Sequence, residues 1–164
     1  MIDKRNRSQS HTGSAAEVDD YQQTIMEHDR KPSNNMVCFD CNHRDEGFNP
    51  FCGDHIVLYV KLEKDVISNI TFQGELCAIS KSSASMMTEA LKGKTISEAE
   101  KLFGNFQGIF NGHVISPDEQ SLLGELAAFN SIKDSPARIK CANLPWQTMK
   151  SLLHTRKEAI TSEL

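Results

Sequence analysis

The stretch HIVLYVKLEKDVISNITF, residues 55–72, decides the fold of this chain. Residues 55–62 and 66–72 are rich in β-branched and aromatic side chains, and the three polar residues between them predict a turn joining two antiparallel strands. Four apolar residues alternate onto one face of the first strand: Ile56, Leu58, Val60 and Leu62. Because Val57 and Tyr59 make the other face apolar too, we expect helices to cover that face as well.

Helical periodicity replaces the strand pattern after Gly74. Residues 79–91 carry apolar side chains three to four positions apart, and Gly93 is a natural end for that helix. Residues 97–106 repeat the same period, and their first residues predict a capping box that starts at Ser97. This part of the chain is therefore expected to be helical.

Two serine–proline pairs mark the starts of the C-terminal helices. Ser116 precedes an apolar run that extends to Ala127, and Ser135 precedes the helix expected to carry Cys141. Another short helix is predicted over about residues 20–31, before the strands. With the strands early and most helices late, the pattern predicts an α+β domain, in which several helices cover a small antiparallel sheet.

Length and composition place the chain among ordinary globular domains. It has 164 residues, of which 38% are hydrophobic, and its net charge is −4. We expect a disordered tail over residues 1–16, one domain over residues 17–155 and a second tail over residues 156–164. The mildly acidic balance argues against nucleic acid or an anionic membrane as a partner. No apolar run approaches the roughly 20 residues that span a bilayer.

The N-terminal residues also bear on the cellular compartment. They are polar and lack the apolar segment of a secretory signal, so we expect a cytoplasmic protein. In a reducing compartment, the five cysteines do not predict a framework of disulfides. Another role for the cysteines is therefore needed.

A metal centre is the role that the spacing of these residues favours. Cys52 and Asp54 stand directly before the first strand of the hairpin, and Cys77 follows the second strand. A hairpin brings its two ends together, so we expect these three residues at one end of the sheet. Gly53 lets the loop curl and point both neighbouring side chains at one place. With Cys141 as a fourth ligand, the set suits tetrahedral Zn²⁺, although the same residues also suit an iron–sulfur cluster.

Three segments resemble the SufU branch of the IscU/NifU N-terminal family: NPFCGD at residues 49–54, CAISKSSASMMTE at 77–89 and RIKCA at 138–142. The resemblance extends from about residue 20 to about residue 153. It implies a SufU/IscU-like fold, with zinc held by Cys52, Asp54, Cys77 and Cys141. Lys140 stands where scaffold-type IscU proteins carry His, and the helical segment 93–135 looks like the insertion that distinguishes SufU proteins.

The resemblance implies a zinc-dependent sulfur relay for iron–sulfur cluster assembly. In such a relay, zinc would hold the Cys52 thiolate until a SufS-type cysteine desulfurase docks. The desulfurase would then pass persulfide sulfur to Cys52. Downstream SUF assembly proteins would receive that sulfur. An alternative function is a scaffold on which a transient iron–sulfur cluster is assembled. A third is an interaction module in which zinc only stabilises the fold. Arg138, one helical turn before Cys141, is predicted to stabilise a thiolate or to pair with Asp54.

Two further features stay open at this level. Cys38 and Cys41 form a CxxC motif, which fits a second metal site, a redox pair or two incidental thiols, and we place the incidental interpretation first. A rival four-thiolate site would combine this pair with Cys52 and Cys77. The serines between residues 80 and 85 are interpreted as small residues that let a helix pack closely, and each His is interpreted as a surface residue.

Overall fold

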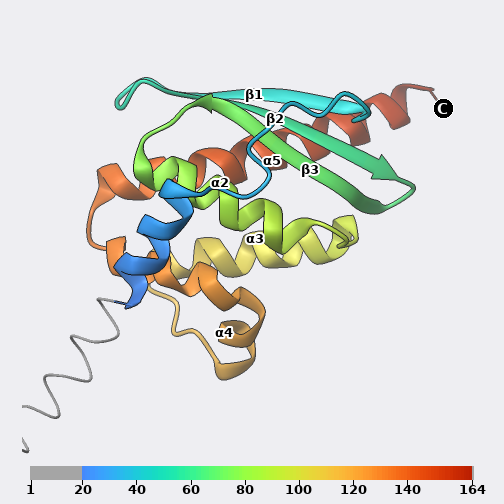
Figure 1. Cartoon of the computed structure of the whole chain (residues 1–164). Helices are drawn as coiled ribbons and strands as arrows, with labels where there is room; N and C mark the ends of the chain where they lie inside the picture. Colours follow the sequence, from blue (N-terminus) through green and yellow to red (C-terminus); the bar gives the residue numbers. More distant parts are fainter. Residues whose placement is uncertain (1–19, 164) are drawn as a thin grey trace, which may run out of the picture.

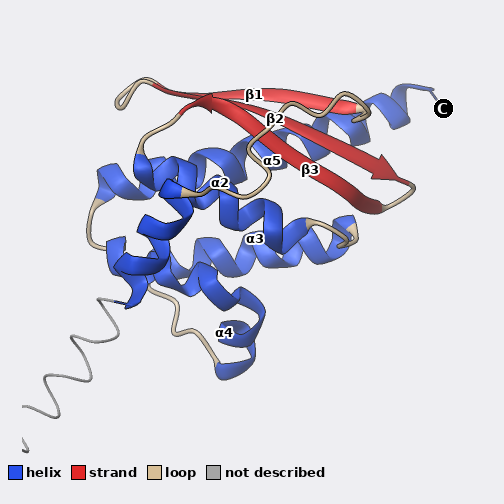
Figure 2. Ribbon diagram, in the orientation of Figure 1, coloured by secondary structure: helices blue, strands red, loops and turns tan. Residues whose placement is uncertain are grey.

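The chain forms one antiparallel sheet with helices packed on one side of it (Figures 1 and 2). The computed structural model describes residues 20–163, so the tail predicted over residues 1–16 lies outside the described residues. The sheet has the strand order β1-β2-β3, with β1 (His43–Asn49), β2 (Asp54–Glu63) and β3 (Val66–Glu75). The α+β class and the small antiparallel sheet predicted from the sequence are confirmed.

The helices follow the sheet in chain order, except for one over residues 20–30 that precedes it. They are α2 (Ala78–Leu91), α3 (Ile96–Phe110), α4 (Pro117–Leu123), the 3₁₀ helix η1 (Gly124–Ile132) and α5 (Pro136–Glu163). None of the helices in the described part of the chain is long and apolar enough to cross a membrane.

The predicted hairpin is present, but the helices of residues 20–163 cover only one of its faces (Figure 1). The inner face of β2 carries Ile56, Leu58, Val60 and Leu62, which are all buried against the helices. On the outer face, Val57 and Tyr59 are half-buried. They pair there with residues of β1 that have long side chains, Glu46 and Arg44 respectively. Cross-strand neighbours of this length shield apolar groups, so no helix is needed on that side.

Strand β1 is not among the elements predicted from the sequence. Its sequence, HRDEGFN, is largely polar, and its residues become a strand by pairing with β2 from His43↔Val60 to Asn49↔Asp54. Gly47 also lets α5 approach this strand closely. A Cβ atom at Gly47 would collide with Thr148 Oγ1 and lie 3.1 Å from Leu144 Cδ1. This close contact sets the position of α5, the helix that carries Cys141.

The observed helix starts and ends agree with the local sequence signals at α4 and differ from them at α3 and α5. Ser116 caps α4 and forms a capping box with Glu119, as the Ser-Pro signal predicted. The capping box of α3 starts at Thr95 rather than at Ser97, and it pairs Thr95 with Glu98. Helix α5 continues through residues 156–163, which were expected to be a tail, because no Gly or Pro ends it there.

His28 is a structural contact rather than the surface residue that was expected. Its Nδ1 lies 2.7 Å from Ser85 Oγ in α2, and its Nε2 lies 2.7 Å from Glu125 Oε2 in η1. The backbone N–H of Ser33 also donates to Ser85 Oγ, over 2.8 Å. These contacts join the helix over residues 20–30 to two later elements of the fold.

Replacing His28 by alanine should therefore destabilise the protein. We expect the free energy of unfolding to fall by about 1–3 kcal/mol, because Ser85 and Glu125 lose a shared partner. Urea denaturation of His28→Ala measures this change. His113→Ala is the matched control, since the imidazole of exposed His113 bonds to Glu119, a residue only six positions along the chain. The control should stay within about 0.5 kcal/mol of the wild type, and an equal loss in both variants would contradict the role of His28.

Candidate metal centre

The two ends of the hairpin bring Cys52, Asp54 and Cys77 to one end of the sheet, as the sequence predicted. Cys52 lies in the turn between β1 and β2, and Asp54 is the first residue of β2. Cys77 caps the N-terminus of α2 directly after β3. Its backbone N–H donates to Asp54 Oδ1 over 2.8 Å, and its Sγ lies 3.5 Å from Asp54 Oδ2. The loop and the helix start are therefore joined through one carboxylate.

Helix α5 brings Cys141 to the same place. The Sγ atoms of Cys52 and Cys141 lie 3.1 Å apart. One ligand atom from each of Cys52, Asp54 and Cys141 lies within 4.8 Å of the others. In a tetrahedral zinc site with Zn–S bonds of about 2.3 Å, neighbouring sulfurs lie about 3.8 Å apart, so the spacing is close to that of a ligand set.

Burial separates the three cysteines of the centre. Cys141 is buried, Cys77 is half-buried and Cys52 is exposed. Gly53, next to Cys52, has a φ of 71°, a left-handed conformation that glycine adopts without strain. The centre therefore has one thiol that faces solvent on a tight turn, one at the N-cap of α2 and one within α5.

Asp54 has the surroundings of a carboxylate that binds a cation. It is only 3% exposed, and its oxygens accept hydrogen bonds from the Cys77 N–H and the Ser80 hydroxyl. Among the side chains of residues 20–156, no Lys, Arg or His forms an ion pair with it. A buried carboxylate without a cation is energetically costly, so the position suits a bound metal ion.

The environment of Cys141 disfavours a free thiolate. Burial, followed by the neighbouring Cys52 and Cys77 thiols, raises the pKa of Cys141 above its ordinary value. Asn49, itself buried, directs its Nδ2 at Cys141 Sγ over 3.7 Å. A metal cation that binds these residues would displace their protons and compensate the thiolate charge.

Ser80 is a functional contact that the sequence interpretation missed. Its Oγ lies 2.7 Å from Asp54 Oδ2 and 3.0 Å from the backbone oxygen of Cys141. Pro145, four residues after Cys141, has no N–H, so the helix itself cannot supply the usual partner of that carbonyl. The Ser80 hydroxyl lies between this carbonyl and Asp54, and its single proton is shared by the two acceptors. Pro145 was the sequence signal for this contact, because it leaves the Cys141 carbonyl without its partner in the helix.

Replacing Ser80 by alanine should weaken zinc binding. The substitution removes the hydroxyl that orients Asp54, and loss of such a supporting contact lowers metal affinity by about 10- to 100-fold. Competition with a chromogenic zinc chelator measures the change. Ser82→Ala is the matched control, because buried Ser82 donates to the Ile79 oxygen of its own helix and, among the described residues, contacts no metal ligand through its hydroxyl. Equal zinc affinities for the two variants would show that Ser80 does not support the centre.

A family model, the NifU-like N-terminal domain, matches residues 20–142. This chain belongs to that family. The matched span contains all four residues of the centre: Cys52, Asp54, Cys77 and Cys141. The assignment confirms the resemblance noted in the sequence.

Individual relatives of this NifU-like chain agree with the family assignment. It is 41% identical over 130 residues to the zinc-dependent sulfurtransferase SufU of Bacillus subtilis (strain 168), covering 79% of this chain and 86% of that protein. It is 36% identical over 109 residues to the iron–sulfur cluster assembly scaffold protein IscU of Thermotoga maritima, covering 66% of this chain and 75% of that protein. The relatives therefore include both a sulfurtransferase and a scaffold.

A solved structure shows the same fold. The crystal structure of a SufU protein from Fervidobacterium islandicum AW-1, assigned as a cluster assembly scaffold for the SUF system, superimposes with a TM-score of 0.74. The two chains are 32% identical, and the match covers 79% of this chain and 93% of the other. The SufU/IscU-like fold expected from the resemblance is confirmed.

Arg138 is predicted to stabilise a thiolate or to pair with Asp54 in this NifU-like domain. It is exposed, and within the described part of the chain no hydrogen bond or ion pair joins it to Asp54, whose oxygens are bonded to Cys77 and Ser80. In this structure Arg138 and Asp54 are not joined, so their pairing stays a prediction. Lys140 is the basic residue beside the loop, since its Nζ lies 4.1 Å from the centre of the Phe51 ring.

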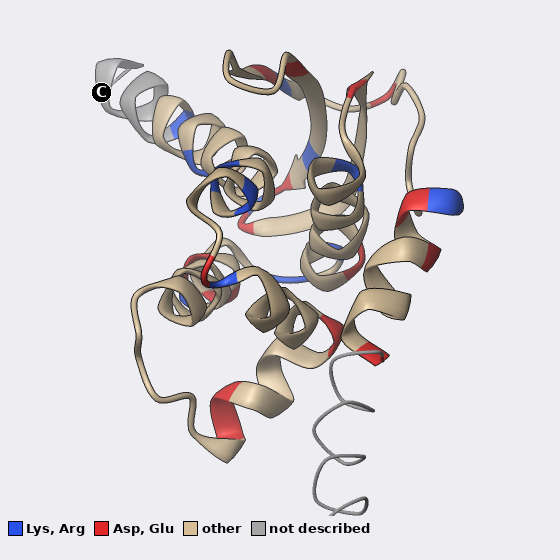
Figure 3. Ribbon diagram, turned by 90° about the vertical axis from the view of Figure 1, so that its left-hand side faces the viewer, with Lys and Arg blue, Asp and Glu red and all other residues tan. Residues whose placement is uncertain are grey.

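Basic residues characterise the helix that carries Cys141. Between residues 136 and 156, α5 contains Lys and Arg but no Asp or Glu, as the colouring of Figure 3 shows. Of these basic residues, Lys140 lies beside the loop of the exposed thiol, over the Phe51 ring.

The rival set of four thiolates is wrong. Cys38 and Cys41 are bonded to each other in a disulfide, and they precede β1 at its far end from the metal centre. The preferred interpretation of these two residues as incidental thiols is wrong as well. Cys52 and Cys77 instead lie with Asp54 and Cys141.

Proposed function

We propose that this NifU-like domain is a zinc-dependent sulfur relay in iron–sulfur cluster assembly. It accepts persulfide sulfur from a SufS-type cysteine desulfurase on Cys52 and passes it to downstream SUF assembly proteins. The observation that carries the proposal is the position of Cys52, an exposed thiol 3.1 Å from the buried Cys141 thiol. The 41% identity to a zinc-dependent sulfurtransferase supports it.

The proposed step is a thiol–persulfide exchange. The Cys52 thiolate attacks the terminal sulfur of the desulfurase persulfide, and a new S–S bond forms on Cys52. The bond between that sulfur and the desulfurase cysteine breaks, and the desulfurase cysteine leaves as a thiolate. The terminal sulfur keeps its proton, so electrons and atoms balance without an external oxidant or reductant.

Four side chains would hold the zinc ion: Cys52, Asp54, Cys77 and Cys141. Zinc bound there would keep the thiols deprotonated and restrain their reactivity. The remaining residues act on these ligands: Ser80 orients Asp54, and Asn49 contacts Cys141. Arg138, exposed one turn before Cys141, is retained as a residue proposed to stabilise a thiolate.

The surface around Cys52 suits a protein partner. Phe51 is 80% exposed and Phe48 is 67% exposed, and Phe48 stacks on His55 with ring centres 4.4 Å apart. Exposed aromatic side chains of this kind are enriched at protein interfaces. The proposed compartment is the cytoplasm, and neither nucleic acid nor a membrane is a proposed partner.

A cluster scaffold is the second candidate, because IscU scaffold proteins are also among the relatives. Two features favour the relay: Lys140 rather than His precedes Cys141, and the helical segment 93–135 separates Cys77 from Cys141. Metal analysis of anaerobically purified protein, combined with a desulfurase rate assay, tests the two functions. A relay should contain zinc and accelerate cysteine desulfuration, whereas iron with acid-labile sulfide would favour the scaffold.

A further inference from the structure

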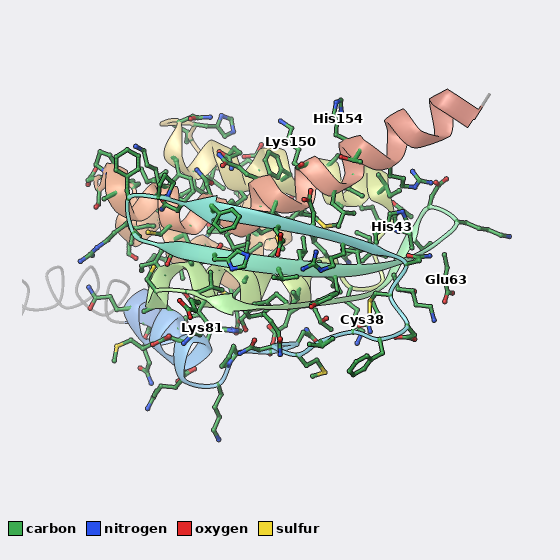
Figure 4. All side chains as sticks on the ribbon, turned by 90° about the horizontal axis from the view of Figure 1, so that it is seen from above. Cys38, His43, Glu63, Lys81, Lys150 and His154 are labelled. Atoms are coloured by element: carbon green, nitrogen blue, oxygen red, sulfur yellow. A yellow bond between two sulfur atoms is a disulfide. The ribbon has the colours of Figure 1, made fainter. Side chains whose placement is uncertain are left out.

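A second pair of sulfur atoms lies away from the metal centre. Cys38 and Cys41 form a disulfide just before β1, whose first residue, His43, pairs with Val60. Strand β1 then runs for seven residues to Asn49, next to the metal loop. At about 3.3 Å per residue, the two ends of the strand are about 20 Å apart. Figure 4 shows Cys38 near His43 and Glu63, where β2 turns into β3.

We propose that Cys38 and Cys41 form a reversible thiol–disulfide exchange site that accepts two electrons from a dithiol. This inference does not rest on the proposed sulfur relay. Both sulfur-bearing residues are partly exposed, and Phe39, which lies between them, is 96% exposed. An incoming thiolate can reach a disulfide of this kind without unfolding the chain.

The disulfide contributes little to holding its segment in place. It encloses only two residues, and the entropic stabilisation by a disulfide is smallest for the shortest rings. Other contacts hold the chain on both sides. Asn42 donates from Nδ2 to the Leu62 oxygen over 2.9 Å and accepts from the Leu62 N–H over 2.9 Å. On the other side, the Phe72 N–H donates to the Asn34 oxygen over 3.0 Å.

The reduced form also finds polar partners already in place. Asp40 Oδ1 lies 3.3 Å from Cys38 Sγ and can accept the proton of a thiol. Asn69 Nδ2 lies 3.7 Å from the same sulfur and donates toward it. Lys61 Nζ lies 3.2 Å from Asp40 Oδ2 and holds that carboxylate beside the pair. Neither redox form therefore leaves Cys38 without hydrogen-bond partners.

The exchange balances in two steps. A thiolate of the dithiol attacks one sulfur of the pair, which breaks the Cys38–Cys41 bond, forms a mixed disulfide and releases the other cysteine as a thiolate. The second thiolate of the dithiol then attacks the mixed disulfide and releases the first cysteine. Two electrons pass to the pair, the dithiol becomes a disulfide, and two protons end on Cys38 and Cys41.

A redox titration of the full, zinc-loaded chain tests this proposal. The ratio of reduced to oxidised dithiothreitol is varied at constant total concentration, samples are alkylated without denaturant, and mass spectrometry follows the peptide with residues 38–41. We expect a reversible transition from no alkyl groups to two, with circular dichroism unchanged. The melting temperature should shift by only about 5 °C, as expected for so short a ring.

The Cys38→Ser/Cys41→Ser double variant is the control, and it should show no redox-dependent labelling in this segment while it keeps one zinc ion. If alkylation of Cys38 and Cys41 requires denaturant, or if reduction unfolds the chain, the disulfide stabilises the fold and the proposal is overturned. Alkylation at every redox ratio would show that the bond does not form. Binding of a second zinc ion that blocks reoxidation would assign the pair, with Asp40, to a metal site instead.

Discussion

Replacement of Cys52 by alanine is expected to reduce persulfide transfer to this chain by at least about 100-fold while zinc remains bound. The substitution removes the exposed thiol of the centre, and the other two cysteines are half-buried or buried. The fold and the metal should persist, because Asp54, Cys77, Cys141 and a water molecule complete a tetrahedral site. Incubation with desulfurase and cysteine, followed by mass spectrometry, locates the added sulfur atom.

Two further variants serve as controls for the Cys52→Ala experiment. The Cys38→Ser/Cys41→Ser double variant changes sulfurs at the opposite end of the sheet, so it should accept sulfur at the wild-type rate. Asp54→Ala should transfer sulfur more slowly but still measurably, because a carboxylate orients the site without bearing sulfur. Sulfur found on Cys141 in the wild type, with Cys52 unmodified, would contradict the assignment of Cys52 as the acceptor.

Replacement of Cys77 by serine is expected to lower zinc occupancy and the melting temperature more than loss of Cys52 does, because the Cys77 thiol is half-buried beside Asp54, whereas Cys52 lies on an exposed turn. Cys77 caps α2, where its Sγ accepts from the Ser80 N–H. Serine is a favoured cap residue, so the substitution removes the thiolate ligand but keeps the helix start. Zinc present at about 1,000 times its dissociation constant stabilises a folded protein by about 4 kcal/mol. Its loss should lower the melting temperature by about 10 °C.

The chelated wild type is the matched control for this variant. If the whole effect comes from lost metal, Cys77→Ser and chelator-treated wild type should melt at the same temperature, and added zinc should restore only the wild type. Metal analysis of the purified variant completes the comparison. Normal zinc occupancy in Cys77→Ser would exclude Cys77 as a ligand, whatever the melting temperature.

Local sequence signals were sufficient to predict the elements whose structure depends on residues close together in the chain. The hairpin over residues 55–72 follows from its β-branched content and its polar turn, and Ser116 before a proline places the start of α4. The juxtaposition of Cys52, Asp54 and Cys77 follows from these same signals, because a hairpin leaves its two ends together. The sequence by itself therefore determined the sheet core and most of the candidate metal centre.

Tertiary contacts decided the features that depend on residues distant in the sequence. Strand β1 is polar, and it is a strand only because β2 offers backbone partners and Gly47 admits α5. Ser80 became a support of the centre only when α5 placed the Cys141 carbonyl 3.0 Å from its hydroxyl. His28 joins elements that lie 57 and 97 residues away along the chain. No local pattern encodes these contacts, because a polar side chain's partner is set by how the helices pack on the sheet.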